Sequence, residues 1–180
     1  MPLTQLESTL KCVIGAGLVA LVGGVAFMYS GIYPIGADVH HNKLTHWALE
    51  TLRERSIARS SADLEVPTDL NESDRLLAGA ADYNDMCSGC HLEPGKKESD
   101  LSLGLYPAPP NLTLRQENMD DVQSQARRRF WIIKHGIKAS GMPAWGAGHD
   151  DERIWNMVAF LQRLPELSSA HYQILTARGG

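Results

Sequence analysis

The 180-residue chain has few cysteines, and their arrangement disfavours two common kinds of site. It contains Cys12, Cys87 and Cys90, an odd number with one close pair. That pattern does not suit a fold stapled by disulfides. Structural zinc is typically held by two Cys-x-x-Cys pairs or an equivalent set, and only one such pair is present. Neither a disulfide framework nor a structural zinc site is therefore expected.

The chain also lacks an excess of positive charge and lacks any strand pattern. Its 17 Lys and Arg residues are outnumbered by 21 Asp and Glu residues, which gives a net charge of -4. A nucleic-acid-binding domain would need a basic face, so that class is disfavoured. Apolar residues recur at helical spacing, without a run of strict alternation or an internal repeat. We therefore predict an all-α fold.

One long segment has no charged residue at all. It runs over residues 12–37, between Lys11 and Asp38, and covers 26 residues. A helix that spans a bilayer needs about 20 apolar residues, whereas the apolar part of a signal peptide has roughly 7–15. No A-x-A cleavage site follows the segment, and the residues before Cys12 do not resemble a lipoprotein signal. We therefore predict that residues 1–37 are an uncleaved, single-span anchor. The N-terminus is expected in the cytoplasm, because the positive charges of Lys11 and the N-terminus outweigh the negative charge of Glu7.

Residues 38–70 are predicted to be an amphipathic helix over about 43–59, followed by a polar linker. Four residues share one side at helical spacing: Leu44, Trp47, Ala48 and Leu52. This side is expected to pack on the following domain or to lie along the membrane surface. The segment also contains three histidines, His40, His41 and His46. A metal site is one interpretation, but polar residues at a wet interface, with Trp47 as an interfacial anchor, are favoured.

Residues 71–180 are predicted to be a compact helical domain. The first helix begins near Ser73 and continues into the sequence "CSGCH" at residues 87–91. Polar, proline- and glycine-rich loops fill most of residues 92–126. A second long helix ends near Gly136, and a final one ends before Pro165.

Cys87, Cys90 and His91 form the Cys-x-x-Cys-His signature of covalent c-type haem attachment. Two thiols at this spacing can reach the two vinyl groups on one edge of a porphyrin, and the histidine then faces the iron. A thioredoxin-like dithiol needs no histidine and accompanies a βαβ pattern, which is absent here. We therefore predict one haem c, attached through both cysteines.

A second axial ligand is expected from the loop "SGMPAWG". Met142 lies there, 51 residues after His91 and between Gly141 and Pro143, and a thioether on a stiff loop is a suitable iron ligand. Alternatives are Met119 in a polar turn, His135 at a helix end, and His149, which is expected to be exposed. Met86 and Met157 have the spacing of core residues.

Together these residues resemble the class I, cytochrome c-like family of mono-haem cytochromes, over about residues 72–166. "GAADYNDMCSGCH" is similar to the family's first helix, with Gly79 and Tyr83 in matching places. "PAPPNL" resembles the loop whose proline carbonyl binds the ligand histidine, here Pro110 or Pro109, with Leu112 against the haem. "FWIIKHGIKASGMPAW" resembles the helix and ligand loop, and "IWNMVAFLQRL" resembles the final helix, where Phe160 takes the place of the aromatic that crosses near Gly79. Residues 1–70 resemble the extension of membrane-tethered members.

The resemblance implies a cytochrome c fold around one haem, after one transmembrane helix and one amphipathic linker helix. The implied iron ligands are His91 and Met142. The residues implied to bind the cofactor are Cys87, Cys90, His91, Pro110, Leu112, Trp131, Ile133, Met142 and Trp145, with Tyr106 as a further candidate. An iron closed on both sides leaves no place for a substrate, so electron transfer is expected rather than catalysis.

Two functional hypotheses follow. The first is a membrane-tethered carrier in the periplasm of a bacterium, which takes electrons from a quinol-oxidising complex or a dehydrogenase and passes them to an oxidase or reductase. The second is a fixed haem c subunit of a larger membrane oxidoreductase or terminal oxidase. A peroxidase or gas sensor needs an open iron, and the loop around Met142 argues against it. Neither nucleic acid nor a small-molecule substrate is expected as a partner.

One predicted helix also carries a cluster of cations, namely Arg127, Arg128, Arg129 and Lys134. A docking patch for a redox partner, or neutralisation of a haem propionate, is one hypothesis. A solvated helix face is the favoured one.

Overall fold

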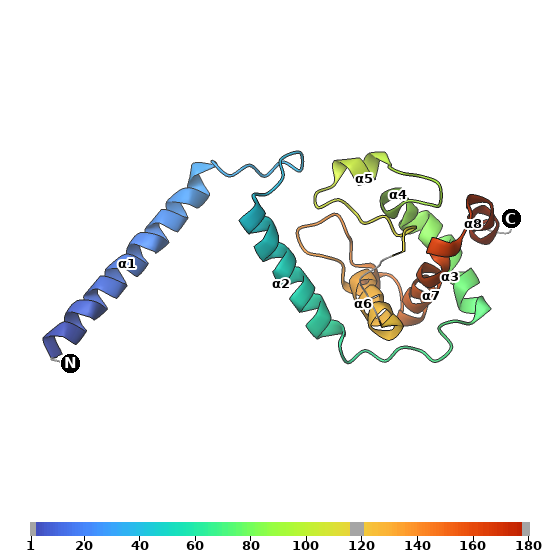
Figure 1. The fold of residues 1–180 in the computed structure, drawn as a ribbon, viewed down its shortest axis with the longest axis horizontal. Helices are drawn as coiled ribbons and strands as arrows, with labels where there is room; N and C mark the ends of the chain where they lie inside the picture. The colour runs from blue at the N-terminus through green and yellow to red at the C-terminus, as the bar shows by residue number, and fades with distance from the viewer. Residues whose placement is uncertain (1–2, 116–120, 178–180) are drawn as a thin grey trace. The chain divides into compact units, whose positions relative to one another are not determined.

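The computed structural model describes residues 3–115 and 121–177. Within these residues all regular structure is helical, which confirms the predicted all-α fold. The chain divides into two compact units, Met1–Val39 and His40–Gly180. Figure 1 labels the helices of both.

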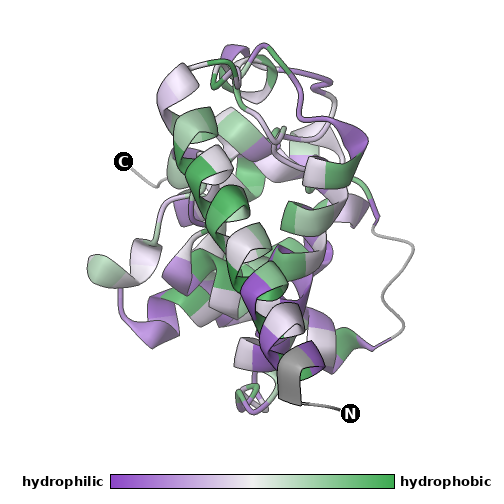
Figure 2. Cartoon of the chain, turned by 90° about the vertical axis from the view of Figure 1, so that its left-hand side faces the viewer, coloured by the Kyte–Doolittle hydropathy of each residue, from purple (hydrophilic) through white to green (hydrophobic). Residues whose placement is uncertain are grey.

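The first unit contains one helix, α1 (Leu3–Ser30). From Cys12 onward, apolar and small residues follow one another along it, which Figure 2 shows as green and pale ribbon. The 26 residues Gln5–Ser30 are long and apolar enough to cross a membrane, and none of the apolar window is buried within the protein. At 1.5 Å per residue such a helix is about 39 Å long, which exceeds the roughly 30 Å hydrocarbon core of a bilayer.

The second unit begins with α2 (Lys43–Ser61), whose first turn is capped by Asn42. The Asn42 side chain accepts a hydrogen bond from the Thr45 N–H at 2.9 Å, which satisfies one of the free donors of a helix start. The helix packs against α6 (Val122–His135), and Ile57, only 2% exposed, is its buried apolar residue. This side of α2 holds the helix on the domain.

The core of the second unit is a close crossing of α3 (Ser73–Met86) and α7 (Asp151–Arg163). Gly79 lies at the crossing, where a Cβ atom would stand 2.0 Å from the Asn156 carbonyl oxygen. Only glycine permits two backbones to approach so closely. Phe160, expected where an aromatic crosses the first helix near Gly79, lies one turn along α3 against Tyr83, with 5.4 Å between ring centroids, and both rings are fully buried.

An ion pair with one buried partner, Asp82, and a C-terminal helix complete this core. Arg153 on α7 donates two hydrogen bonds to the buried Asp82 carboxylate on α3, at 2.7 and 2.8 Å. Helix α8 (Ser169–Thr176) covers the other side of α3, where the Tyr172 hydroxyl is 3.0 Å from Asn84 Oδ1. The remaining elements are short: α4 (Ser88–His91), α5 (Asp100–Gly104), η1 (Trp145–Ala147) and η2 (Leu164–Glu166).

Candidate functional site

The turn that follows α3 brings the two thiols and the imidazole together. Helix α4 continues almost directly from α3, because the N–H groups of Cys90 and His91 both donate to the Cys87 carbonyl, at 3.1 and 2.8 Å. The turn ends at Leu92 with φ 71°, a left-handed conformation that costs a non-glycine residue about 1 kcal/mol or more. The buried Tyr83 hydroxyl donates to the Leu92 carbonyl at 2.6 Å and so holds this end of the turn. The family resemblance gave Tyr83 a matching position in the first helix but did not indicate this hydrogen bond.

Both cysteines of the motif are free thiols. Cys87 is buried and Cys90 is half-buried. Burial raises the pKa of the Cys87 thiol to about 12, and the nearby charges of Asp82 and Cys90 act in the same direction. The two sulfurs are thus presented from one helical turn, one toward the core and one nearer the surface.

The His91 ring is held by the loop that precedes α6. Its Nδ1 lies 2.9 Å from the Pro110 carbonyl oxygen, and the Leu112 N–H donates to the His91 carbonyl at 3.2 Å. A carbonyl can only accept, so Nδ1 carries the proton and Nε2 keeps its lone pair. Of the two prolines considered from the sequence, Pro110 makes this contact. Burial lowers the pKa of the His91 imidazole, while the Pro110 hydrogen bond works against that shift.

The Met142 loop is held by its own backbone and one serine. Helix α6 ends at Gly136 with φ 65°, and the next residue, Ile137, donates its N–H to the Met142 carbonyl at 3.1 Å. The Ser140 hydroxyl donates to the Ile137 carbonyl at 2.8 Å and accepts from the Met142 N–H at 3.1 Å. These bonds close a tight loop around a half-buried methionine that packs against the core. Sequence analysis placed Met142 but gave Ser140 no role.

The apolar residues expected around the cofactor are placed as follows. Ile133 is 6% exposed and belongs to the core, and Leu112 and Trp145 are half-buried against it. Trp131 is half-buried, with its ring centroid 4.9 Å from that of His135. Tyr106 stacks on His40 at 4.7 Å, and its hydroxyl accepts the His41 N–H at 3.2 Å. Tyr106 therefore links its loop to the segment before α2.

The alternative ligands differ in their positions. His149 was expected to be exposed, and this is wrong: it is half-buried, with its ring 5.6 Å from that of Trp145 and its N–H bonded to the Trp145 carbonyl. The short η1 turn, which the sequence did not indicate, causes this burial. His135 is exposed, and Met119 lies outside the described residues. Within the described part of the chain, no three His, Cys, Asp or Glu side chains are grouped so that they could hold a metal ion.

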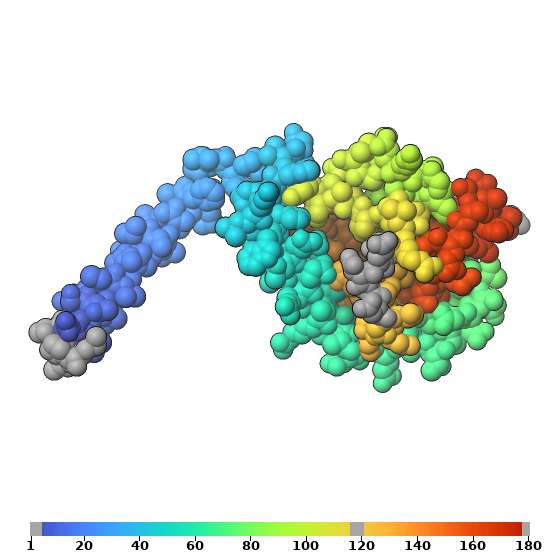
Figure 3. Space-filling view, in the orientation of Figure 1, coloured from blue at the N-terminus to red at the C-terminus, as the bar shows by residue number. Residues whose placement is uncertain are grey.

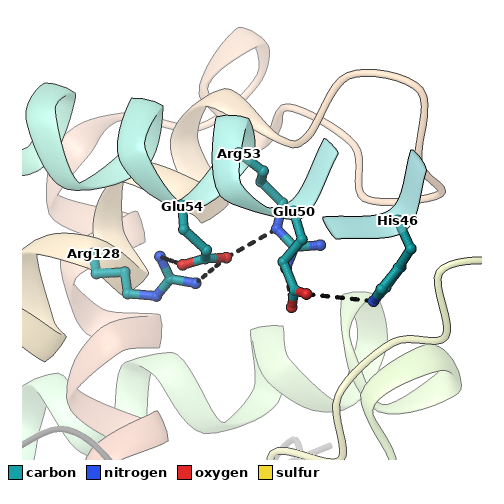
Figure 4. Close-up of polar contacts among 5 residues, drawn as sticks. All are labelled: His46, Glu50, Arg53, Glu54 and Arg128. Atoms are coloured by element: carbon teal, nitrogen blue, oxygen red, sulfur yellow. Dashed lines mark hydrogen bonds and ion pairs between the residues drawn. The ribbon is translucent and has the colours of Figure 1, made fainter. Parts of the chain in front are cut away.

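The four cations of α6 each have a partner within the chain. Arg128 binds Glu54 of α2 with both nitrogens, at 2.8 and 3.1 Å, as Figure 4 shows. Arg127 pairs with Asp121 and Lys134 with Asp151. Arg129 donates to the Leu161 carbonyl, and burial lowers the pKa of its guanidinium. These half-buried side chains therefore make structural contacts, which the favoured interpretation of a solvated helix face did not include.

The donor set suits a covalently bound haem. One turn, held by backbone hydrogen bonds, supplies two thiols and an imidazole with a free Nε2 lone pair. The second turn, held in the same way, supplies a thioether. The family described as "Cytochrome C oxidase, cbb3-type, subunit III" matches residues 74–161, which run from the first turn of α3 to the last turns of α7. Comparisons with curated proteins and with solved structures give no match.

Proposed function

We propose that the chain uses residues 74–161, a c-type cytochrome domain, as a membrane-tethered, mono-haem electron carrier in a periplasmic respiratory chain. One observation carries the proposal: His91 is oriented by the Pro110 carbonyl with Nε2 left free for an iron. A haem c, when bound, supplies an iron that exchanges one electron without bond making or breaking in a substrate.

The chain's own residues would hold that group and tune it. Cys87 and Cys90 would form the thioether links, and His91 and Met142 would be the axial ligands. The Pro110 carbonyl keeps the His91 tautomer and ring plane constant, as partners of metal-ligating histidines commonly do. Leu112, Trp131, Ile133 and Trp145 would exclude water, and an apolar shell with a methionine ligand raises the reduction potential.

The proposed location is the bacterial inner membrane, with the haem domain in the periplasm. Helix α1 is long and apolar enough for a single span. Haem c is attached outside the cytoplasmic membrane in bacteria, so the domain after α1 would lie on that side. The weak positive charge before the span agrees with a cytoplasmic N-terminus.

A second candidate function is a fixed haem subunit of a larger oxidase. The description of the matching family, a subunit of a cbb3-type oxidase, favours it. Purification in mild detergent distinguishes the two. A carrier elutes alone, whereas a subunit elutes in a constant ratio with other chains.

The ligand assignment is tested by Met142→Leu, with Met86→Leu as the matched control. Both changes preserve volume at half-buried methionines, and such exchanges usually cost less than about 1.5 kcal/mol. The oxidised wild type and Met86→Leu are expected to show the weak band near about 695 nm that reports iron–thioether ligation, and Met142→Leu is expected to lack it. Absence of the band in the wild type, with ready binding of carbon monoxide to the reduced iron, would refute the closed site and favour a catalytic or sensing role.

A further inference from the structure

Helix α2 has two sides that differ in what they contact. One side carries Glu50, Glu54, Ile57 and Ser61 at spacings of three and four residues, and its C-terminal part packs on the domain. Ile57 and Ser61 are the buried residues of the helix. Figure 3 shows α2 as a turquoise column at the edge of this unit.

The other side of α2 presents large apolar residues to solvent. Leu44 is 71% exposed, Trp47 63% and Leu52 68%, and Ala48 between them is exposed as well. Packing of this face on the domain was one of two expectations, and these exposures exclude it. An uncovered stripe that includes a tryptophan is unusual in water and marks an interaction surface.

Two unpaired arginines extend the same stripe. Arg55 and Arg59 follow Leu52 at spacings of three and four residues, both are exposed, and neither has an ion-pair partner among the residues that the structure describes. The acids of the helix lie on the other side and are paired: Glu50 with His46 and Arg53, and Glu54 with Arg53 and Arg128, as Figure 4 shows. The exposed face is therefore apolar in its first half and positively charged in its second.

We propose that this α2 face, defined by Leu44, Trp47, Ala48, Leu52, Arg55 and Arg59, docks on the surface of an anionic lipid bilayer. The inference rests on the proposed membrane tether. Helices that lie in the membrane interface combine an apolar stripe and tryptophan with Arg or Lys, and the cations attract anionic lipid headgroups. Residues 31–42, twelve in all, separate α1 from α2. Fully extended, they reach about 40 Å, so an inserted α1 keeps α2 close to a bilayer.

The test uses the full-length holoprotein in lipid nanodiscs and hydroxyl-radical footprinting read by mass spectrometry. The oxidation rate of Trp47 is compared between discs of phosphatidylcholine alone and discs of equal parts phosphatidylcholine and phosphatidylglycerol. Leu114 and Ile174, which are exposed apolar residues outside α2, are the internal references. Trp47 is expected to be oxidised more slowly in the anionic discs, while the references do not change.

Paired charge variants separate the role of the arginines from the net charge. Arg55→Gln with Arg59→Gln is compared with Lys97→Gln with Lys138→Gln, which removes the same charge from exposed positions outside α2. Loss of two cations from an anionic surface is expected to lower the docked-to-undocked ratio about thirtyfold. The Trp47 protection should therefore vanish in the arginine variant and persist in the lysine variant.

Three results would overturn the proposal. Trp47 oxidation that is insensitive to lipid charge means that no anionic surface covers the face. Protection that rises with the number of protein copies per disc means that a second copy covers it. Protection in native membranes but in neither kind of disc means that a protein partner covers it. A failed tether is recognised separately, because the haem absorbance would then not co-elute with the discs, and a failed haem assignment would leave no such absorbance.

Discussion

The crossing of α3 and α7 at Gly79 gives a prediction whose sign opposes helix propensity. Replacing a helical glycine by alanine ordinarily stabilises a helix by about 1 kcal/mol. At position 79 the new Cβ would lie 2.0 Å from the Asn156 carbonyl oxygen, 2.4 Å from its carbon and 2.8 Å from the Met157 nitrogen. All three atoms belong to the backbone, so no side-chain rotation relieves the contact. An ordinary carbon–oxygen contact is about 3.3 Å or more, so the helices must separate by roughly 1.3 Å.

Separation of α3 from α7 loosens the close packing at their crossing. Overpacking of a core costs about 1–3 kcal/mol, and a backbone clash belongs at the upper end of that range. After the propensity gain is subtracted, Gly79→Ala is expected to lower the free energy of unfolding by about 2 kcal/mol, which lowers Tm by roughly 10 °C for a domain of this size. Thermal unfolding of the holoprotein, followed by far-ultraviolet circular dichroism and by haem absorbance, measures this loss.

Gly104→Ala is the matched control for this measurement. Gly104 is also a helical residue, the last of α5, but no atom lies within 4 Å of its added Cβ, and its backbone is not left-handed. Its Tm is expected to stay within a degree or two of the wild type or to rise, as for a compatible glycine-to-alanine change. If Gly79→Ala proves as stable as Gly104→Ala, the close crossing is not a determinant of the fold and the reasoning fails.

Two further predictions concern the ligand loop and α2. Ser140→Ala removes the hydrogen bond that the Ser140 hydroxyl accepts from the Met142 N–H, which is worth about 1 kcal/mol. Added imidazole should then displace Met142 about fivefold more readily, as judged by loss of the band at about 695 nm. The control Ser56→Ala should not change this displacement. Partial burial alone would raise the pKa of the Glu54 carboxyl, but hydrogen bonds from Arg53 and Arg128 outweigh it, so the pKa lies below the ordinary 4.5. The ionised Glu54 carboxylate therefore stabilises the α2–α6 contact above pH 4.5, and this stabilisation is lost as the pH falls through the lowered pKa. Hydrogen exchange in α2, corrected for intrinsic rates, should accelerate a few-fold in acid for the wild type. A Glu54→Gln variant that kept this acceleration would disprove the assignment.

Local patterns were sufficient to predict the long helices and the order of the chemical groups, but not the eight-residue α8. Helical spacing and end signals placed helices at α2, α3, α6 and α7, because amphipathic periodicity and capping act within a few residues. The resemblance to cytochromes c pointed to the proline carbonyl beside His91, and the structure has this contact at Pro110. The covalent attachment and the role of Met142 stay predictions.

Contacts between residues far apart in the chain could not be predicted in this way. The Asp82–Arg153 pair joins residues 71 apart, and nothing near either residue indicates its partner. Glu54 and Arg128 are 74 residues apart, and no local pattern indicates that they pair. For this reason the sequence favoured a solvated face for the α6 cations. Ser140 illustrates a different limit, since a serine in a loop has many possible acceptors and only the folded backbone shows which one it uses.

The short connection between α1 and α2 has a consequence for how often this protein would meet a redox partner. Residues 31–39, which precede the part held by Tyr106, would have a root-mean-square span of roughly 17 Å as a flexible chain. If α1 is inserted, encounters with a partner in the same membrane become a search by lateral diffusion. The rate of electron delivery would then follow the number of carriers per unit area of membrane. Swelling of the surrounding compartment, which dilutes a dissolved carrier, would leave that rate unchanged.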